Sequence, residues 1–198
     1  MAQKLMPRLD FPAGHRGGPS RPIIAKDLDE IAQRLLHDPA LCASDRVASV
    51  LIAVFAQPVS RVARLTADDV AIEEENVAIR FGDTAVSMPA PVASDVRRLL
   101  GDVAERSAAM VRHPLWLFPS HEPGRPIGEQ ALSRRMKAIG VECNGARRAA
   151  LLQLAGRVPA AIVADLLGVH VSTATQWAQM SGRPWGDIGA ASLRSTQG

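Results

Sequence analysis

The alternation of hydrophobic and polar residues predicts helices along most of the chain. In residues 25–39 apolar side chains recur every three or four positions, and Pro39 is expected to end this helix. Residues 44–58 are nearly all apolar. They predict a central, buried helix that starts at a Ser44 cap and is closed or kinked by Pro58.

The hydrophobic period changes to two in the next part of the chain. Short runs rich in β-branched residues lie at 70–72, 77–81 and 85–88, and residues 74–76 and 82–83 supply turn-forming side chains between them. This pattern predicts a small antiparallel β-meander inside a helical protein.

Helical spacing returns in residues 90–110, 128–141 and 145–158, and an extended apolar segment lies at 114–120. The order is therefore helices, a meander, helices, an extended segment and further helices. Such an order predicts an α+β fold that is mostly helical.

Residues 164–177, which read ADLLGVHVSTATQW, have the pattern of a helix-turn-helix pair. Gly168 permits the left-handed turn that ends the first helix, and Ser172 or Thr173 is expected to cap the second. Helix-turn-helix proteins place short polar side chains at the start of the second helix in the DNA major groove. The candidates for such contacts are His170, Ser172, Thr173, Thr175 and Gln176.

Composition and charge are compatible with a nucleic-acid partner. Of the 198 residues 47% are hydrophobic, so the chain can bury a core, and its net charge is +3. We expect a flexible basic arm at 1–22, one domain at 23–191 and a disordered tail at 192–198. Basic candidates for contacts with DNA phosphates gather in the C-terminal half: Arg134, Arg135, Lys137, Arg147, Arg148 and Arg183.

Other classes of chemistry find little support. Cys42 and Cys143 are far apart and form no CxxC pair, so we expect two reduced thiols, no metal and no cofactor. There is no apolar leader, and no apolar run approaches the roughly 18 residues of a membrane span. The expected location is the cytoplasm, with no membrane partner, and the nucleoid if the protein binds DNA.

Several of these strings resemble, in the same order, the catalytic domain of the tyrosine recombinase or phage integrase family, over roughly residues 44–187. LTADDV at 65–70 is similar to the end of the family's first helical block, and NVAIRFGDTAVSMP at 76–89 to its β-hairpin. WLFPS at 116–120 is similar to its leu-phe-pro segment. Residues 144–168 resemble the block that begins his-x-x-arg and ends leu-leu-gly-his.

This resemblance implies a DNA-cutting chemistry, but most of its groups are missing. In the family a tyrosine attacks the phosphodiester, arginines and histidines hold the phosphoryl oxygens, and a hairpin lysine protonates the leaving oxygen. Arg147 matches the arginine of his-x-x-arg. At the positions of the first arginine, the two histidines and the tyrosine stand Pro58, Asn144, Val169 and Ala178. The hairpin has no lysine, and the chain has no tyrosine.

We therefore expect a DNA-binding protein on a catalytically degenerate tyrosine-recombinase fold. It would be a regulator or accessory factor in recombination or in the biology of a mobile element, without enzymatic activity. Arg61 lies three residues after Pro58, and we expect it to point to a different part of the helix or turn. We expect no counterpart of the family's N-terminal core-binding domain and, as a result, weaker binding to duplex DNA.

Two alternatives stay open. One is a self-assembly module that does not bind DNA and associates through the C-terminal segment at 182–193. The other is an active recombinase with an atypical nucleophile, for which Ser181 or Thr175 is the candidate.

Overall fold

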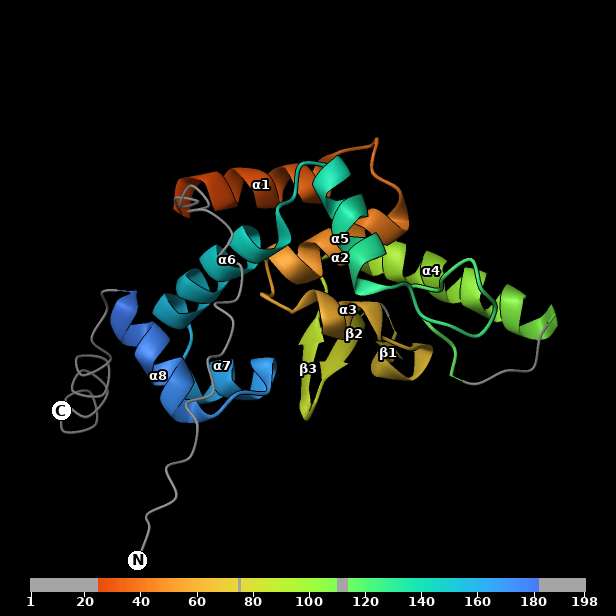
Figure 1. Cartoon of the computed structure of the whole chain (residues 1–198). Helices are drawn as coiled ribbons and strands as arrows, with labels where there is room; N and C mark the ends of the chain where they lie inside the picture. The colour runs from red at the N-terminus through yellow and green to blue at the C-terminus, as the bar shows by residue number, and fades with distance from the viewer. Residues whose placement is uncertain (1–24, 75, 110–113, 182–198) are drawn as a thin grey trace, which may run out of the picture.

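The computed structural model describes residues 25–74, 76–109 and 114–181. Within them, helices lie above and to the sides of a small antiparallel sheet at the lower edge of the fold (Figure 1), in the order that the hydrophobic pattern predicts. The predicted arm at 1–22, the tail at 192–198, the segment at 182–193 and Arg183 lie outside the described residues. No helix in the described part of the chain is long and apolar enough to cross a membrane.

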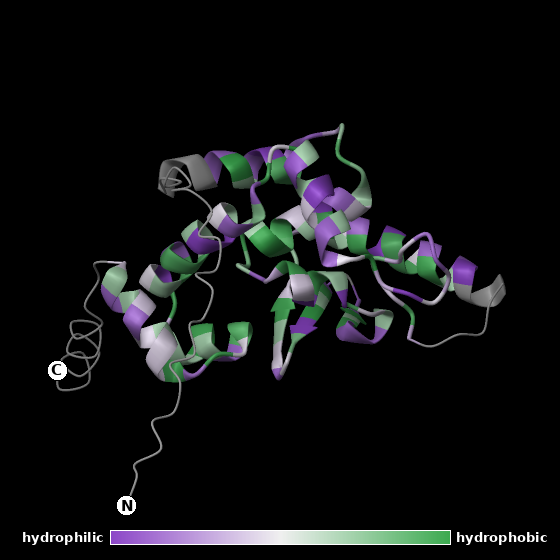
Figure 2. Cartoon of the chain, viewed as in Figure 1, coloured by the Kyte–Doolittle hydropathy of each residue, from purple (hydrophilic) through white to green (hydrophobic). Residues whose placement is uncertain are grey.

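Helix α2 (Ala43–Ala53) forms the centre of the core, as its apolar sequence predicts. Every residue from Val47 to Ala53 is buried because α1 (Ala25–His37), α4 (Ala90–Ala109) and α6 (Cys143–Arg157) pack around it. Hydrophobic green is accordingly concentrated near the centre of the molecule in Figure 2.

The ends of α2 differ from the prediction. The N-cap residue is Cys42 rather than Ser44, and it makes no side-chain capping bond. The helix ends at Ala53, before the chain turns through Ala56 at a left-handed φ of 54°. Pro58 neither closes nor kinks α2. It is the N-cap of α3 (Val59–Ala63), where its fixed φ suits a helix start and its missing N–H costs nothing.

The predicted meander is confirmed. Strands β1 (Val70–Glu73), β2 (Asn76–Phe81) and β3 (Thr84–Ser87) form an antiparallel sheet in that order. Ile79 of β2 pairs with Val70 of β1 and Val86 of β3. Alternate side chains of β2 face the core, because α4 and α7 (Ala160–Leu167) both pack against this strand.

The extended segment at 114–120 lies along the turn between α3 and the sheet. Leu117 donates its N–H to the carbonyl of Leu65, and Ala67 donates to the carbonyl of Leu115. Residues Ala67–Asp69 form a 3-10 helix, η1, with a capping box from Thr66. The chain then enters α5 (Glu129–Ala138), which packs on α3 and α2.

The helix pair at the end of the described chain matches the sequence pattern except for one cap. Helix α7 ends at Gly168, whose φ of 64° is the predicted left-handed turn. Helix α8 (Val171–Met180) begins at His170, whose Nδ1 accepts the N–H of Ser172, so neither Ser172 nor Thr173 is the cap. Histidine is a less common N-cap than serine or threonine, and for this reason the sequence pattern predicted Ser172 or Thr173 instead of His170.

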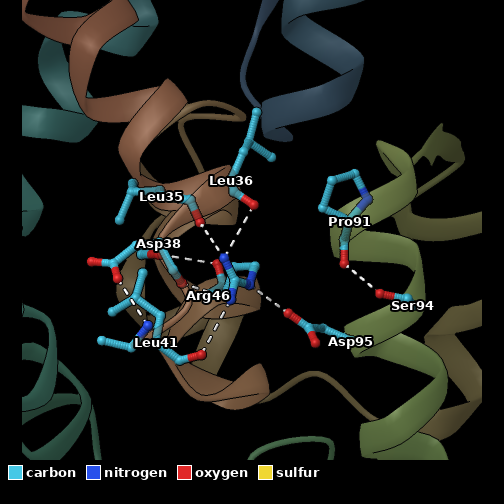
Figure 3. Close-up of polar contacts among 10 residues, drawn as sticks. Leu35, Leu36, Asp38, Leu41, Arg46, Pro91, Ser94 and Asp95 are labelled. Atoms are coloured by element: carbon cyan, nitrogen blue, oxygen red, sulfur yellow. Dashed lines mark hydrogen bonds and ion pairs between the residues drawn. The ribbon is translucent and has the colours of Figure 1, made fainter.

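Arg46 organises the N-terminal helices from inside the protein (Figure 3). Its side chain is only 12% exposed, and Nε lies 2.7 Å from Oδ2 of Asp95 on α4. The remaining guanidinium nitrogens donate to carbonyl oxygens of α1 and of the loop before α2. These carbonyls belong to Leu35, Leu36, Asp38 and Leu41. Asp95 therefore neutralises the charge of Arg46, and the guanidinium N–H donors are used in hydrogen bonds within the fold.

Candidate nucleic-acid interface

Two hollows meet at the start of α3, where Pro58 and Ser60 line both. The first, of about 480 Å³, lies between α3, α5 and the start of α6. The second, of about 460 Å³, lies between α3 and the β2–β3 hairpin. The arginine that the sequence comparison identified, Arg147, opens into the first hollow.

Arg147 is held in place by a strained loop. Its Nε donates to the carbonyl oxygen of Ala56 at 2.8 Å, and Ala56 is the residue with the left-handed φ. Burial lowers the pKa of Arg147, and the nearby positive charge of Arg61 lowers it further. Arginine side chains remain protonated in proteins. Arg61 and Arg147 therefore place two positive charges near one another.

Arg61 corrects the expectation that it points elsewhere. Its Nη1 donates to Oε1 of Gln57 and to the carbonyl oxygen of Leu166 at the end of α7, each at 3.1 Å. A Cβ on Gly168 would lie 2.6 Å from Nη2 of Arg61, so glycine makes this approach possible. Arg61 thus reaches across from α3 to the turn between α7 and α8.

Within the described part of the chain, the arginine pair lacks a counter-ion. Arg61 and Arg147 form no ion pair among the described residues. Glu129 lines the first hollow with Arg147 but lies beyond ion-pair distance. This arrangement favours binding of an anion from solution.

The first hollow also contains a thiol that is chemically quiet. Cys143 lines it but is only 7% exposed. Burial raises the pKa of Cys143, and the negative charge of Glu142 acts in the same direction. The thiol therefore stays protonated and is a poor nucleophile.

The second hollow was not foreseen from the sequence. It is lined by Arg61, Arg64 and Arg80. Its one acidic residue, Asp69, accepts the backbone N–H and the hydroxyl of Thr66, both at 2.8 Å, through Oδ2. In the sequence, the arginines at 61, 64 and 80 lie among five acidic residues, at 68, 69 and 73–75, so no local excess of positive charge marks them. Only the fold shows that the sheet turns Arg80 toward α3.

The predicted cations on α5 and α6 separate into two kinds. Arg134, Lys137 and Arg148 are exposed and make no ion pair among the described residues. Arg135 instead lies 2.6 Å from Asp45 Oδ1, an ion pair whose angle does not make a hydrogen bond. Its charge is already paired, which leaves less for a phosphate.

Some of the α8 side chains predicted to contact DNA make hydrogen bonds within their own part of the fold. The hydroxyl of Ser172 lies 2.8 Å from Nδ1 of His170, and Thr175 donates its hydroxyl to the carbonyl of Val171. Gln176 is exposed, whereas Thr173 is half-buried. The helix start therefore presents a polar surface, with His170 and Ser172 held in one arrangement.

The position that matches the family's tyrosine lies inside the protein. Ala178 is 2% exposed, in the face of α8 that packs against the rest of the fold. Ser181 donates its hydroxyl to the carbonyl of Ala178 at 2.6 Å. The hydroxyl protons of Ser181 and Thr175 are thus both held by carbonyls of their own helix.

Comparisons with known proteins agree on the fold. No protein-family model matches this sequence, and neither does any curated protein. Among solved structures the chain is similar to the XerA recombinase, with 15% identity and a TM-score of 0.55 over 84% of this chain and 63% of that one. It is also similar to the XerH site-specific recombinase bound to its difH substrate before cleavage, with 16% identity and a TM-score of 0.52 over 77% of this chain.

A post-cleavage complex of XerH with palindromic difH gives 14% identity and a TM-score of 0.53 over 84% of this chain. This chain spans 63% of the XerA chain and about half of the XerH chains, 48% and 51%. The predicted fold, mostly helical α+β with a small sheet like the recombinase catalytic domain, is confirmed.

Proposed function

We propose that this protein binds duplex DNA without cutting it and acts as a regulator or accessory factor in recombination. The observation that carries the proposal is the unneutralised arginine pair, Arg61 and Arg147, at the hollows beside Pro58. A phosphodiester supplies the missing negative charge and the hydrogen-bond acceptors that a guanidinium prefers.

Neighbouring features support a DNA surface. The exposed charges of Arg134, Lys137 and Arg148 lie on the helices that border the first hollow. Helices α7 and α8 present the helix-turn-helix pattern next to Arg61. The fold is similar to that of XerH bound to its difH substrate, which adds weight to a nucleic-acid partner.

The absence of cutting is inferred from the same geometry. Ala178 offers no nucleophile, and its burial leaves no room for a reacting phosphate at that position. Ser181 and Thr175 lack a base at their hydroxyl protons, since each is bonded to a helix carbonyl. We expect no covalent protein–DNA adduct on a suicide substrate. Such an adduct would establish an active recombinase instead.

The decisive measurement is fluorescence anisotropy of a labelled random duplex across a salt titration. Wild type should bind with an affinity that falls as salt rises, because bound arginines release counterions from the phosphates. Arg147→Ala/Arg148→Ala should weaken binding about tenfold or more at low salt.

A matched control removes two charges elsewhere. Arg98 and Arg106 are exposed on α4, and no residue of α4 lines either hollow. Arg98→Ala/Arg106→Ala should bind nearly as wild type does. Binding that is undetectable at low salt, or indifferent to salt, would overturn the proposal. Light scattering would then test self-association through residues 182–193.

A further inference from the structure

We infer that the second hollow, between α3 and the β2–β3 hairpin, is a separate phosphate-binding position for the DNA backbone. This inference rests on the proposed DNA binding and assigns to it two residues, Arg64 and Arg80, outside the positions that match the recombinase family. The hollow lies next to the one that contains Arg147, since Ser60 and Pro58 border both.

The charge balance of the hollow points to an anion. Three guanidinium groups line it, and Asp69 is its one carboxylate. Oδ2 of Asp69 already accepts two hydrogen bonds from Thr66, so this carboxylate serves the start of η1. Arg64 and Arg80 form neither an ion pair nor a side-chain hydrogen bond within the described chain. A phosphate oxygen would reduce the mutual repulsion and satisfy their donors.

The shape of the hollow admits a backbone phosphate. Its volume is about 460 Å³. At the hairpin end the wall is Gly82, at a left-handed φ of 66°, with open space where a side chain would begin. At the other end Ser60 adds a hydroxyl at the border with the first hollow. Because Pro58 and Ser60 line both hollows, we expect a DNA strand that enters the first hollow to pass the second as well.

The three arginines have different roles. Arg61 uses Nη1 on Gln57 and Leu166, and it holds α3 against the end of α7. It is a positioning residue for the site. Arg64 and Arg80 are exposed and carry their full set of donors. They are the groups that contact the phosphate, and their loss should leave the fold intact.

The test compares Arg64→Ala/Arg80→Ala with the control Arg98→Ala/Arg106→Ala, which loses the same charge. We expect the first variant to bind duplex DNA about tenfold or more weakly at low salt. The slope of log affinity against log salt should fall by about two, because two phosphate contacts are lost. Its melting temperature should equal that of wild type. Arg64→Lys/Arg80→Lys should restore most of the salt slope, since a lysine also neutralises a phosphate.

The outcomes separate this inference from the proposed function. If wild type binds and the Arg64→Ala/Arg80→Ala variant behaves as the control does, the second hollow holds no phosphate while DNA binding stands. If wild type does not bind, both ideas fail together. If Arg64→Ala/Arg80→Ala loses affinity and also melts at a lower temperature, Arg64→Lys/Arg80→Lys shows whether the lost affinity comes from lost phosphate contacts or from lost stability. Recovery of stability without recovery of the salt slope would overturn the phosphate position.

Discussion

Arginines serve opposite purposes in two regions of this molecule. At the N-terminal helices, the Arg46 side chain is only 12% exposed, paired with Asp95 and bonded to four carbonyl oxygens (Figure 3). Beside Pro58, Arg61 and Arg147 lie close together, and no carboxylate in residues 25–74, 76–109 and 114–181 pairs with either. Arg46 thus has its charge satisfied by the fold, whereas the second region keeps charge for something outside it.

The contrast shows how to distinguish a structural arginine from a binding one. A buried charge must be paired and hydrogen-bonded, or the fold loses stability. Around the hollows the fold tolerates a lowered pKa at Arg147, which is the sign of an unfavourable charge environment. An anion that binds beside Arg147 relieves this unfavourable environment, and the relief strengthens its binding. The following substitutions test the contrast through stability.

The largest effect is expected at the satisfied arginine. Arg46→Ala leaves Asp95 buried without a partner and frees four carbonyl oxygens. We expect a loss of about 3–5 kcal/mol in the free energy of unfolding, measured by urea denaturation. In the double variant Arg46→Ala/Asp95→Ala the loss should be smaller than the sum of the two single losses. A cost below about 1 kcal/mol for Arg46→Ala would mean that this arginine is dispensable to the core.

An intermediate loss of stability is expected at Gly168, where Arg61 contacts the turn after α7. Gly168→Ala forces alanine into a left-handed conformation and pushes its Cβ onto Arg61. The expected cost is about 1–2 kcal/mol for the backbone alone, with the bond from Arg61 to Leu166 also weakened.

Gly101→Ala is the matched control for this change. Gly101 is exposed in the middle of α4, and a Cβ there meets nothing within 4 Å. This control should raise the stability by about 0.5–1 kcal/mol, since alanine is the better helix former. A neutral Gly168→Ala would contradict the left-handed conformation at this turn, which is strained for any residue with a side chain.

The smallest effect is expected at the partly exposed ion pair between Arg135 on α5 and Asp45 on α2. The side chains of Arg135 and Asp45 are 40% and 19% exposed, so solvent screens their attraction. Arg135→Ala should cost about 0.2–1 kcal/mol in stability and change DNA affinity less than Arg134→Ala does. If Arg135→Ala weakened DNA binding more than Arg134→Ala, its ion pair would open in the complex, and the distinction between paired and available arginines would fail at this site.

Much of the fold could be predicted from hydrophobic spacing alone. The unbroken apolar run of α2 requires burial on all sides, and the alternation in β2 requires one buried and one outer face. Gly168 could be predicted as a left-handed turn because few other residues adopt it at low cost. These are local rules, and each acts over a few residues.

The arrangement around Arg61 could not be predicted, because it depends on residues about a hundred positions apart. Counting residues along a helix places Arg61 away from Pro58, but the packing of α3 against the end of α7 brings its guanidinium back to the site. The pairing of Arg135 with Asp45 is likewise set by how α5 packs on α2. Contacts between helices far apart in the sequence therefore determine which of the candidate cations are paired within the fold and which can bind a phosphate.

The close approach of Arg61 to Gly168 also has an evolutionary consequence. The left-handed φ favours glycine at 168, and a side chain there would also push the guanidinium end of Arg61 away from its bond to the carbonyl of Leu166. Positions 61 and 168 should therefore vary together among homologous sequences. Where position 168 carries anything larger than glycine, position 61 should carry a residue shorter than arginine, and the turn between the last two described helices should be anchored in another way.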